Sequence, residues 1–206
     1  MSDPFYYQTI EKSAVAEFTD RGSKFLAYTF PVDSIDAFKL VLQQLKKEHP
    51  KASHHCFAYR IGAEGMTYRV SDDGEPSGTA GRPILGQIDS KAVTNVCVIV
   101  VRYFGGTLLG VPGLINAYKT AASFALQLSP IQRLPVEIKY EVHFDYTITN
   151  EVLKNIRRFN CTVLKQEMQL FCLYEIGIPK ISEMEAVHAF ESIRGASIKK
   201  ISDSVS

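Results

Sequence analysis

The sequence carries almost no net charge. Its 23 lysine and arginine residues are nearly balanced by 22 aspartate and glutamate residues, which gives +1 at pH 7. A chain without an overall field of either sign attracts a nucleic acid or an anionic surface only through a local patch. The composition, with 46% hydrophobic and 22% charged residues, is that of an ordinary globular protein with enough apolar material for a sizeable core.

Long hydrophobic runs are missing as well. The most apolar segment, VCVIVV at 96–101, falls far short of the roughly 20 residues that span a bilayer. The N-terminal stretch MSDPFYYQTI has neither the basic region nor the apolar region of a signal peptide. We therefore expect a cytoplasmic protein without a membrane partner.

Closely spaced cysteine pairs are absent too. The four cysteines lie in separate apolar or strand-like runs, at Cys56, Cys97, Cys161 and Cys172. This usage predicts buried, reduced thiols. His54, His55 and Cys56 resemble part of a zinc site, but neighbours on a strand point to opposite faces and no second ligand pair completes the set. With no GxSxG motif either, no catalytic residue is predicted.

The apolar residues that are present predict an α+β protein with two domains. Residues 33–50 and 114–130 show the periodicity of amphipathic helices, and the run TNVCVIVVRYF at 94–104 predicts a strand buried on both faces. After about residue 137 the order strand, helix, strand, strand, helix, strand predicts a ferredoxin-like βαββαβ domain. We place the first domain at 1–132 and the second at 137–206.

Three stretches combine glycine with charged or polar residues. They are DRGSKF at 20–25, SDDGEPSGTAGRP at 71–83 and RYFGGTLLGVPGL at 102–114. The third follows the buried strand and precedes a helix, a context in which backbone N–H groups cradle anions. Gly105 and Gly110 have P-loop spacing, but Val111 and Pro112 stand where that motif needs lysine and a hydroxyl residue. A nucleotide hydrolase of the P-loop kind is therefore excluded.

The basic residues of these stretches suggest a small cationic cleft. If the loops converge, such a cleft suits a phosphate group or a nucleic-acid backbone. The alternative is that each basic side chain is an ordinary solvated charge. We predict these ligand- or anion-binding residues: Lys24, His54, Gly78, Gly81, Arg82, Arg102, Tyr103, Gly105 and Gly106.

The acids of the second stretch allow two interpretations. Asp72, Asp73 and Glu75 could ligate Mg²⁺ or Ca²⁺, but their spacing is not that of an EF-hand loop. Acids at a turn more often cap backbone N–H groups and stay solvated. We favour the capping interpretation and predict no cofactor, with Mg²⁺ as the alternative.

Four motifs together resemble those of the YigZ/IMPACT family. They are SKFLA at 23–27, HHCFAYRIG at 54–62, SDDGEPSGTAGRPIL at 71–85 and VRYFGGTLLG at 101–110. The resemblance covers the whole chain. It implies a first domain similar to the second domain of a small-subunit ribosomal protein, a two-layer α/β sandwich. It also implies a second, ferredoxin-like domain similar to the last domain of elongation factor G.

The resemblance also implies a function. The eukaryotic relatives regulate translation through protein partners, and both domains are similar to modules of RNA-facing translation proteins. We therefore expect a regulator of translation, rather than an enzyme, that binds RNA, the ribosome or translation factors through the Gly-rich cleft. The alternative is an enzyme or binder acting on a phosphorylated small molecule with a metal. One departure is Val111 and Pro112, where many bacterial members have threonine and glycine.

Overall fold

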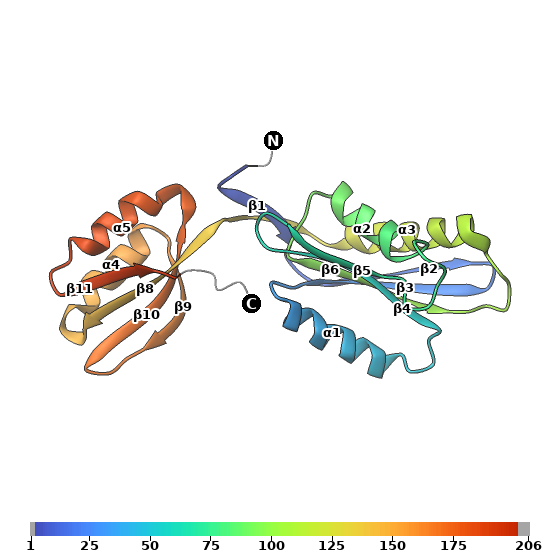
Figure 1. Ribbon diagram of the computed structural model, residues 1–206, viewed down its shortest axis with the longest axis horizontal. Coiled ribbons are helices and arrows are strands. Elements are labelled where there is room, and N and C mark those ends of the chain that lie inside the picture. The colour runs from blue at the N-terminus through green and yellow to red at the C-terminus, as the bar shows by residue number, and fades with distance from the viewer. Residues whose placement is uncertain (1–2, 202–206) are drawn as a thin grey trace. The chain divides into compact units, whose positions relative to one another are not determined.

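The fold is described by a computed structural model, in which residues 3–201 are placed (Figure 1). Contacts divide the chain into two compact units. The first unit is Tyr7–Leu134, and the second is Pro135 onward together with the residues before Tyr7. The division falls within the stretch 133–136, which separates the two predicted domains. The predicted α+β, two-domain fold is confirmed, and each unit is described below by itself.

A five-stranded antiparallel sheet forms the centre of the first unit. Its strands, in spatial order, are β2 (Ala14–Asp20), β3 (Ser23–Pro31), β6 (Val96–Tyr103), β4 (His54–Ile61) and β5 (Thr67–Ser71). Two further strands, β1 (Tyr6–Ile10) and β7 (Ile131–Pro135), pair with each other in a separate sheet. The central strand β6 pairs on both sides, with β3 and with β4, so it positions the residues that follow it.

Helices cover both faces of this sheet. Val98 and Val100 of β6 pack in the same core as α2 (Gly81–Ser90) and α3 (Gly110–Leu128). Ile99 and Val101, which alternate with them, pack in a second core with α1 (Ile35–Glu48). Figure 1 shows α1 on one side of the sheet and the other two helices on the opposite side.

The prediction that the central strand is buried on both faces is therefore confirmed. This burial has a consequence for the architecture, because a strand that is apolar at every position needs cover on both faces. The first unit accordingly has three layers, one more than the expected two-layer sandwich.

The helix α3 begins earlier than its apolar stripe suggests. It starts at Gly110, and Pro112 lies in its first turn. The first N–H groups of a helix have no intrahelical partner, so the missing N–H of proline removes no hydrogen bond there. The departure at Pro112 is thus accommodated as part of a helix start.

The second unit has the strand order of a ferredoxin-like domain. Its elements are β8 (Glu137–Asp145), α4 (Thr149–Arg158), β9 (Thr162–Glu167), β10 (Phe171–Pro179), α5 (Glu183–Glu191) and β11 (Ala196–Lys200). They form one antiparallel sheet in the order β11-β8-β10-β9. This is the arrangement that the βαββαβ prediction requires.

Helices α4 and α5 cover one face of the second sheet, and the side chains of the other face lie outside the core. Val142 and Phe144 of β8 share a core with Val152 of α4 and Phe190 of α5. Lys139 and His143, which alternate with these core residues, are exposed.

Among residues 3–201 no helix is long and apolar enough to cross a membrane. All four cysteines are free thiols.

Candidate functional site at the end of β6

A pocket of about 500 Å³ lies where β6 and β4 meet the Gly-rich loops of the first unit. The sheet register places His54 of β4 opposite Arg102 of β6. The hydrogen bond from Arg102 to Glu75 brings the third and second Gly-rich stretches together. The pocket is lined by Ser53, His54, Glu75, Pro76, Arg102, Phe104, Leu108, Leu109, Gly110, Val111 and Leu114. Its wall is therefore largely apolar, with a polar end made by three charged or titratable side chains.

The polar end contains a buried ion pair. Nη1 of Arg102 donates to Oε1 of Glu75 at 2.6 Å, and only 6% and 4% of these two side chains are exposed. The hydroxyl of Tyr118, on α3, donates to the same oxygen at 2.7 Å. The guanidinium also lies over the rings of Phe25 and Phe104, 5.4 and 5.5 Å from their centroids. Arg102 is thus held and neutralised within the wall of the pocket.

His54 has a defined tautomer. Its Nδ1 lies 2.8 Å from the backbone carbonyl oxygen of Asp73, which can only accept a hydrogen bond. Nδ1 therefore carries the proton, and in the neutral ring Nε2 presents a lone pair. That nitrogen is 3.8 Å from Oε1 of Glu75.

Asp72 braces the loop that carries Glu75. Its carboxylate accepts hydrogen bonds from the backbone N–H groups of Gly78, Ala80 and Gly81, at 2.8, 2.9 and 2.9 Å. Burial raises the pKa of Asp72, but these three hydrogen bonds and the nearby Arg82 outweigh burial and leave that pKa below its usual value. The carboxylate therefore closes the loop onto the start of α2.

The other acids of the loop are also engaged by protein groups. Asp73 accepts the backbone N–H of His55 at 2.6 Å, and Glu75 is paired with Arg102. Within the described part of the chain, no group of three or more His, Cys, Asp or Glu residues is arranged to hold a metal ion. Asp72 and Asp73 thus cap backbone N–H groups as the capping interpretation describes, whereas Glu75 is buried and bonds to side chains instead.

The first and third Gly-rich stretches meet by a close backbone contact. A Cβ added to Gly105 would overlap the backbone of Gly22, so only glycine fits there. The backbone N–H of Gly105 donates to Oγ of Ser23 at 3.1 Å. Gly81 is restricted in the same way, because its Cβ would meet the backbone nitrogen of Ser71 at 2.8 Å. Both glycines permit close packing of loops.

Several predicted residues lie away from the pocket. Lys24 directly precedes Phe25, and Tyr103 directly follows Arg102, the strand partner of Phe25. Because neighbours on a strand point to opposite faces, Lys24 and Tyr103 lie on the face opposite Arg102. There Lys24 pairs with Glu17 at 2.7 Å, and the hydroxyl of Tyr103 contacts Nδ1 of His49 at 2.9 Å. Arg82 is exposed on α2 and does not line the pocket.

The structure therefore brings together only part of the predicted set. His54 and Arg102 converge in the pocket, and Gly105 lies next to it in the chain. Gly78 and Gly81 shape the neighbouring loop through Asp72, and Gly106 adopts a positive φ of 84°. The single cationic cleft expected from Lys24, Arg82 and Arg102 is not assembled, because strand alternation places Lys24 on the opposite face from Arg102 and Arg82 lies on α2 outside the pocket.

The predicted set of binding residues does not include Tyr118 and Cys56, which are members of this site. Tyr118 occurs within the apolar stripe of the helix at 114–130, and a polar tip inside such a stripe is a signal for a buried hydrogen bond. The sulfur of Cys56 lies 3.0 Å from the carbonyl oxygen of Asp72 and 3.3 Å from the hydroxyl of Tyr118, and its one S–H can be donated to either. Burial raises the pKa of both groups, so neither is a nucleophile at neutral pH.

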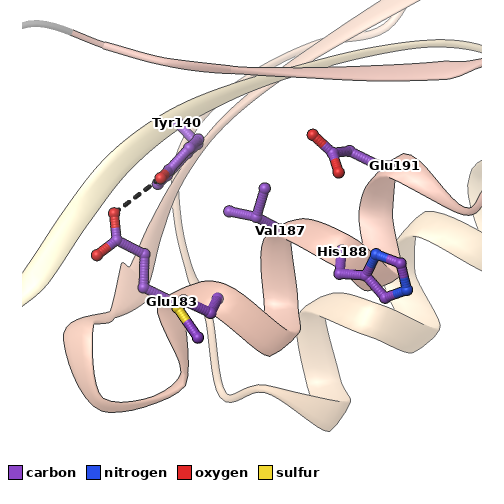
Figure 2. A pocket seen from close by; sticks show the side chains of 6 residues that line it. Tyr140, Glu183, Val187, His188 and Glu191 are labelled. Carbon is purple, nitrogen blue, oxygen red and sulfur yellow. Dashed lines mark hydrogen bonds between the residues drawn. The ribbon is translucent and has the colours of Figure 1, made fainter.

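A second pocket, of about 410 Å³, lies in the ferredoxin-like unit, where sequence reasoning placed no candidate residue. Figure 2 shows it between Tyr140 of β8 and the side chains of α5. The Tyr140 hydroxyl donates to Oε1 of Glu183 at 2.8 Å, and Nζ of Lys200 donates to the same oxygen at 2.8 Å. These contacts satisfy Glu183 within the unit.

Comparison with known proteins places the chain in a family. Residues 21–126 match the model of the Impact N-terminal domain. The Escherichia coli protein "IMPACT family member YigZ" is 33% identical over 168 residues, which cover 80% of this chain and 82% of that protein. The rat "Protein IMPACT" is 41% identical over 100 residues, which cover 46% of this chain and 31% of the rat protein.

A solved structure agrees over both units. The crystal structure of a hypothetical protein superposes with a TM-score of 0.76 at 28% identity, and the match covers 97% of this chain and 98% of that one. The matched domain model spans all the loops that line the pocket. The chain therefore belongs to the IMPACT family, with the Impact N-terminal domain as its first unit.

Proposed function

We propose that this protein regulates translation by binding RNA, the ribosome or a translation factor through the pocket of its first unit. Membership of the IMPACT family supports a role in translation, because the eukaryotic relatives that the sequence resembles act there. The match to the rat protein covers about half of this chain.

The observation that carries the proposal is the exposed apolar rim of the pocket. Phe104, Leu108 and Val111 are 48%, 81% and 51% exposed, although each has a large apolar side chain. Single exposed apolar residues are common on protein surfaces, but a group of them around a concave site marks a binding surface. The rim therefore favours a partner that covers it.

The electrostatics of the pocket favour a partner recognised by shape more than by charge. Glu75 neutralises Arg102, and Lys24 lies on the other face of the sheet. Arg82 is the predicted basic residue that remains exposed beside the second Gly-rich stretch. A phosphate backbone is bound through several free cations, so this pocket offers weaker support for nucleic acid than the sequence alone suggested.

The test is cosedimentation of the purified protein with ribosomes, with pull-down of translation factors from the unbound fraction. Leu108→Asp places a charge on the rim without disturbing a buried residue, and we expect it to reduce binding at least about tenfold. Leu170→Asp is the matched control, because Leu170 is also exposed, at 67%, but lies in the second unit. Equal binding by wild type and Leu108→Asp would refute the pocket as the binding site.

A further inference from the structure

The polar end of the pocket presents hydrogen-bond acceptors. Both donors to Glu75, from Arg102 and Tyr118, bond to Oε1, and no residue among 3–201 donates to Oε2. Oε2 is also not among the fully buried atoms that lack a partner, so it keeps some exposure, and Glu75 is one of the residues that line the pocket. A free carboxylate oxygen is thus available there.

His54 adds a second acceptor beside this carboxylate. Because Nδ1 donates to the carbonyl of Asp73, the neutral ring offers the lone pair of Nε2. Nε2 lies 3.8 Å from Oε1 of Glu75, so it is close to this carboxylate, and neither group can donate to the other while the ring is neutral. A hydrogen-bond donor placed between them would satisfy both acceptors.

The charge balance indicates that this donor is uncharged. Arg102 already compensates the carboxylate of Glu75 at 2.6 Å, so an added cation would be left without a counter-charge in a largely apolar site. A phosphate fits no better, because it is anionic and rich in acceptors, as the pocket is. An O–H or N–H group of a neutral molecule matches the site.

The walls set the shape of the group that carries the donor. Phe104, Leu109 and Leu114 make an apolar lining, and the volume of about 500 Å³ is in the range that holds one aromatic ring system. The apolar surface also continues outside the pocket, because Leu108, Val111 and Ile115 lie at successive turns around the start of α3 and are exposed. One small molecule inside the pocket would leave this surface uncovered.

We propose that the pocket takes a tyrosine or tryptophan side chain of a partner protein. The ring lies against the apolar walls, and its O–H or N–H group is directed at Oε2 of Glu75 and Nε2 of His54. Apolar residues next to the inserted side chain cover Leu108 and Val111. The assignment of this partner to the translation machinery rests on the function proposed above. The proposed binding of an aromatic side chain rests on the chemistry of the pocket alone.

The test uses three aromatic probes, of which the tyrosine and phenylalanine amides differ only in the hydroxyl group. N-acetyltyrosinamide, N-acetyltryptophanamide and N-acetylphenylalaninamide are titrated, up to their solubility limits, into the isotopically labelled full chain while its amide NMR spectrum is followed. We expect the tyrosine and tryptophan amides to shift the signals of Phe104, Leu108 and Val111. The phenylalanine amide should bind about tenfold more weakly, because it leaves the two acceptors unpaired.

Variants identify the acceptors. His54→Phe removes the Nε2 lone pair and should abolish the preference for tyrosine over phenylalanine, while His143→Phe, at an exposed site in the second unit, should keep it. If His54→Phe does not fold, Leu108→Ser tests the rim instead and should weaken all three amides. Equal binding of the three amides, the absence of any shift, or shifts at the same residues caused by an oligouridylate would each overturn the proposal.

The two proposals fail in different ways. If Leu108→Asp loses ribosome or translation-factor binding but the three amides bind alike, the function stands and the aromatic-donor inference falls. If the amides are distinguished as expected but no component of the translation machinery binds, the pocket chemistry stands and the proposed function falls.

Discussion

Each unit contains a trio in which a tyrosine and a basic residue donate to one glutamate, but the surroundings of the two trios differ. In the first, Tyr118 and Arg102 both donate to Oε1 of Glu75, and in the second, Tyr140 and Lys200 both donate to Oε1 of Glu183. The exposed fractions of the acid and base are 4% and 6% in the first trio, against 24% and 57% in the second. Figure 2 shows the tyrosine and the acid of the second trio.

The difference shows that burial decides what such a trio does. A buried ion pair is costly to break, because removing one partner leaves an unpaired charge out of water. An exposed pair competes with water and salt and contributes little. The first trio therefore fixes the wall of a pocket, and the second adds a small amount to the stability of a surface.

The largest expected effect comes from breaking the buried pair. Arg102→Ala leaves the Glu75 carboxylate uncompensated and should lower the free energy of unfolding by about 3–5 kcal/mol, measured by urea denaturation. Arg102→Met combined with Glu75→Gln removes both charges and should recover much of this loss. A loss below about 1 kcal/mol in Arg102→Ala would show that the pair is solvated like the one in the second unit.

The loop that positions Glu75 gives the next effect. Asp72→Ala removes the acceptor for three backbone N–H groups and should cost about 1–3 kcal/mol. Asp145→Ala is the control, because Asp145 accepts from Thr147 on an exposed turn of the second unit and should cost less. Equal losses in the two variants would mean that the loop is not braced as described.

A pH effect near neutrality is expected from His55 in the first unit. Burial lowers the pKa of His55 below its ordinary value of 6.5, and the attraction of Asp73 offsets this only in part. The unfolded chain then binds a proton that the folded chain resists, so stability is complete above pH 6.5 and falls as the pH drops below it. The thermal midpoint followed from pH 7 to 5 should fall less in His55→Gln than in His143→Gln.

The smallest effect comes from breaking the exposed pair. Lys200→Ala removes the partner of Glu183 at a site where the lysine is more than half exposed, and it should cost at most about 1 kcal/mol. Urea denaturation measured beside Arg102→Ala gives the comparison directly. A loss in Lys200→Ala as large as that in Arg102→Ala would contradict the view that burial separates the two trios.

Much of the architecture follows from local sequence patterns. The βαββαβ order predicts the ferredoxin-like unit, because each element is marked by its own periodicity and the topology of that order is restricted. The run at 94–104 likewise predicts a strand buried on both faces. The third layer of the first unit follows from that burial, whereas the family resemblance implied a fold with only two layers.

The site could be predicted less completely, because it depends on contacts between distant residues. Arg102 is marked by its position at the end of a buried strand and before glycines, yet its partner Glu75 lies 27 residues earlier, in a loop that the hydrogen bonds of Asp72 hold in place. Strand alternation places Lys24 and Tyr103 on the face opposite Arg102. A sequence shows that neighbours on a strand diverge, but not which of the two points toward the site.

The salt dependence of binding tests most directly whether the pocket recognises its partner without a free cationic cleft. The affinity of the wild-type protein for ribosomes, or for a translation factor captured from them, is measured at about 50 and 200 mM KCl. We predict a decrease of about fourfold or less, as expected if no more than one phosphate contact, through Arg82, takes part. A decrease of about a thousandfold, accompanied by loss of binding in Arg82→Ala, would show a basic nucleic-acid site and contradict this account.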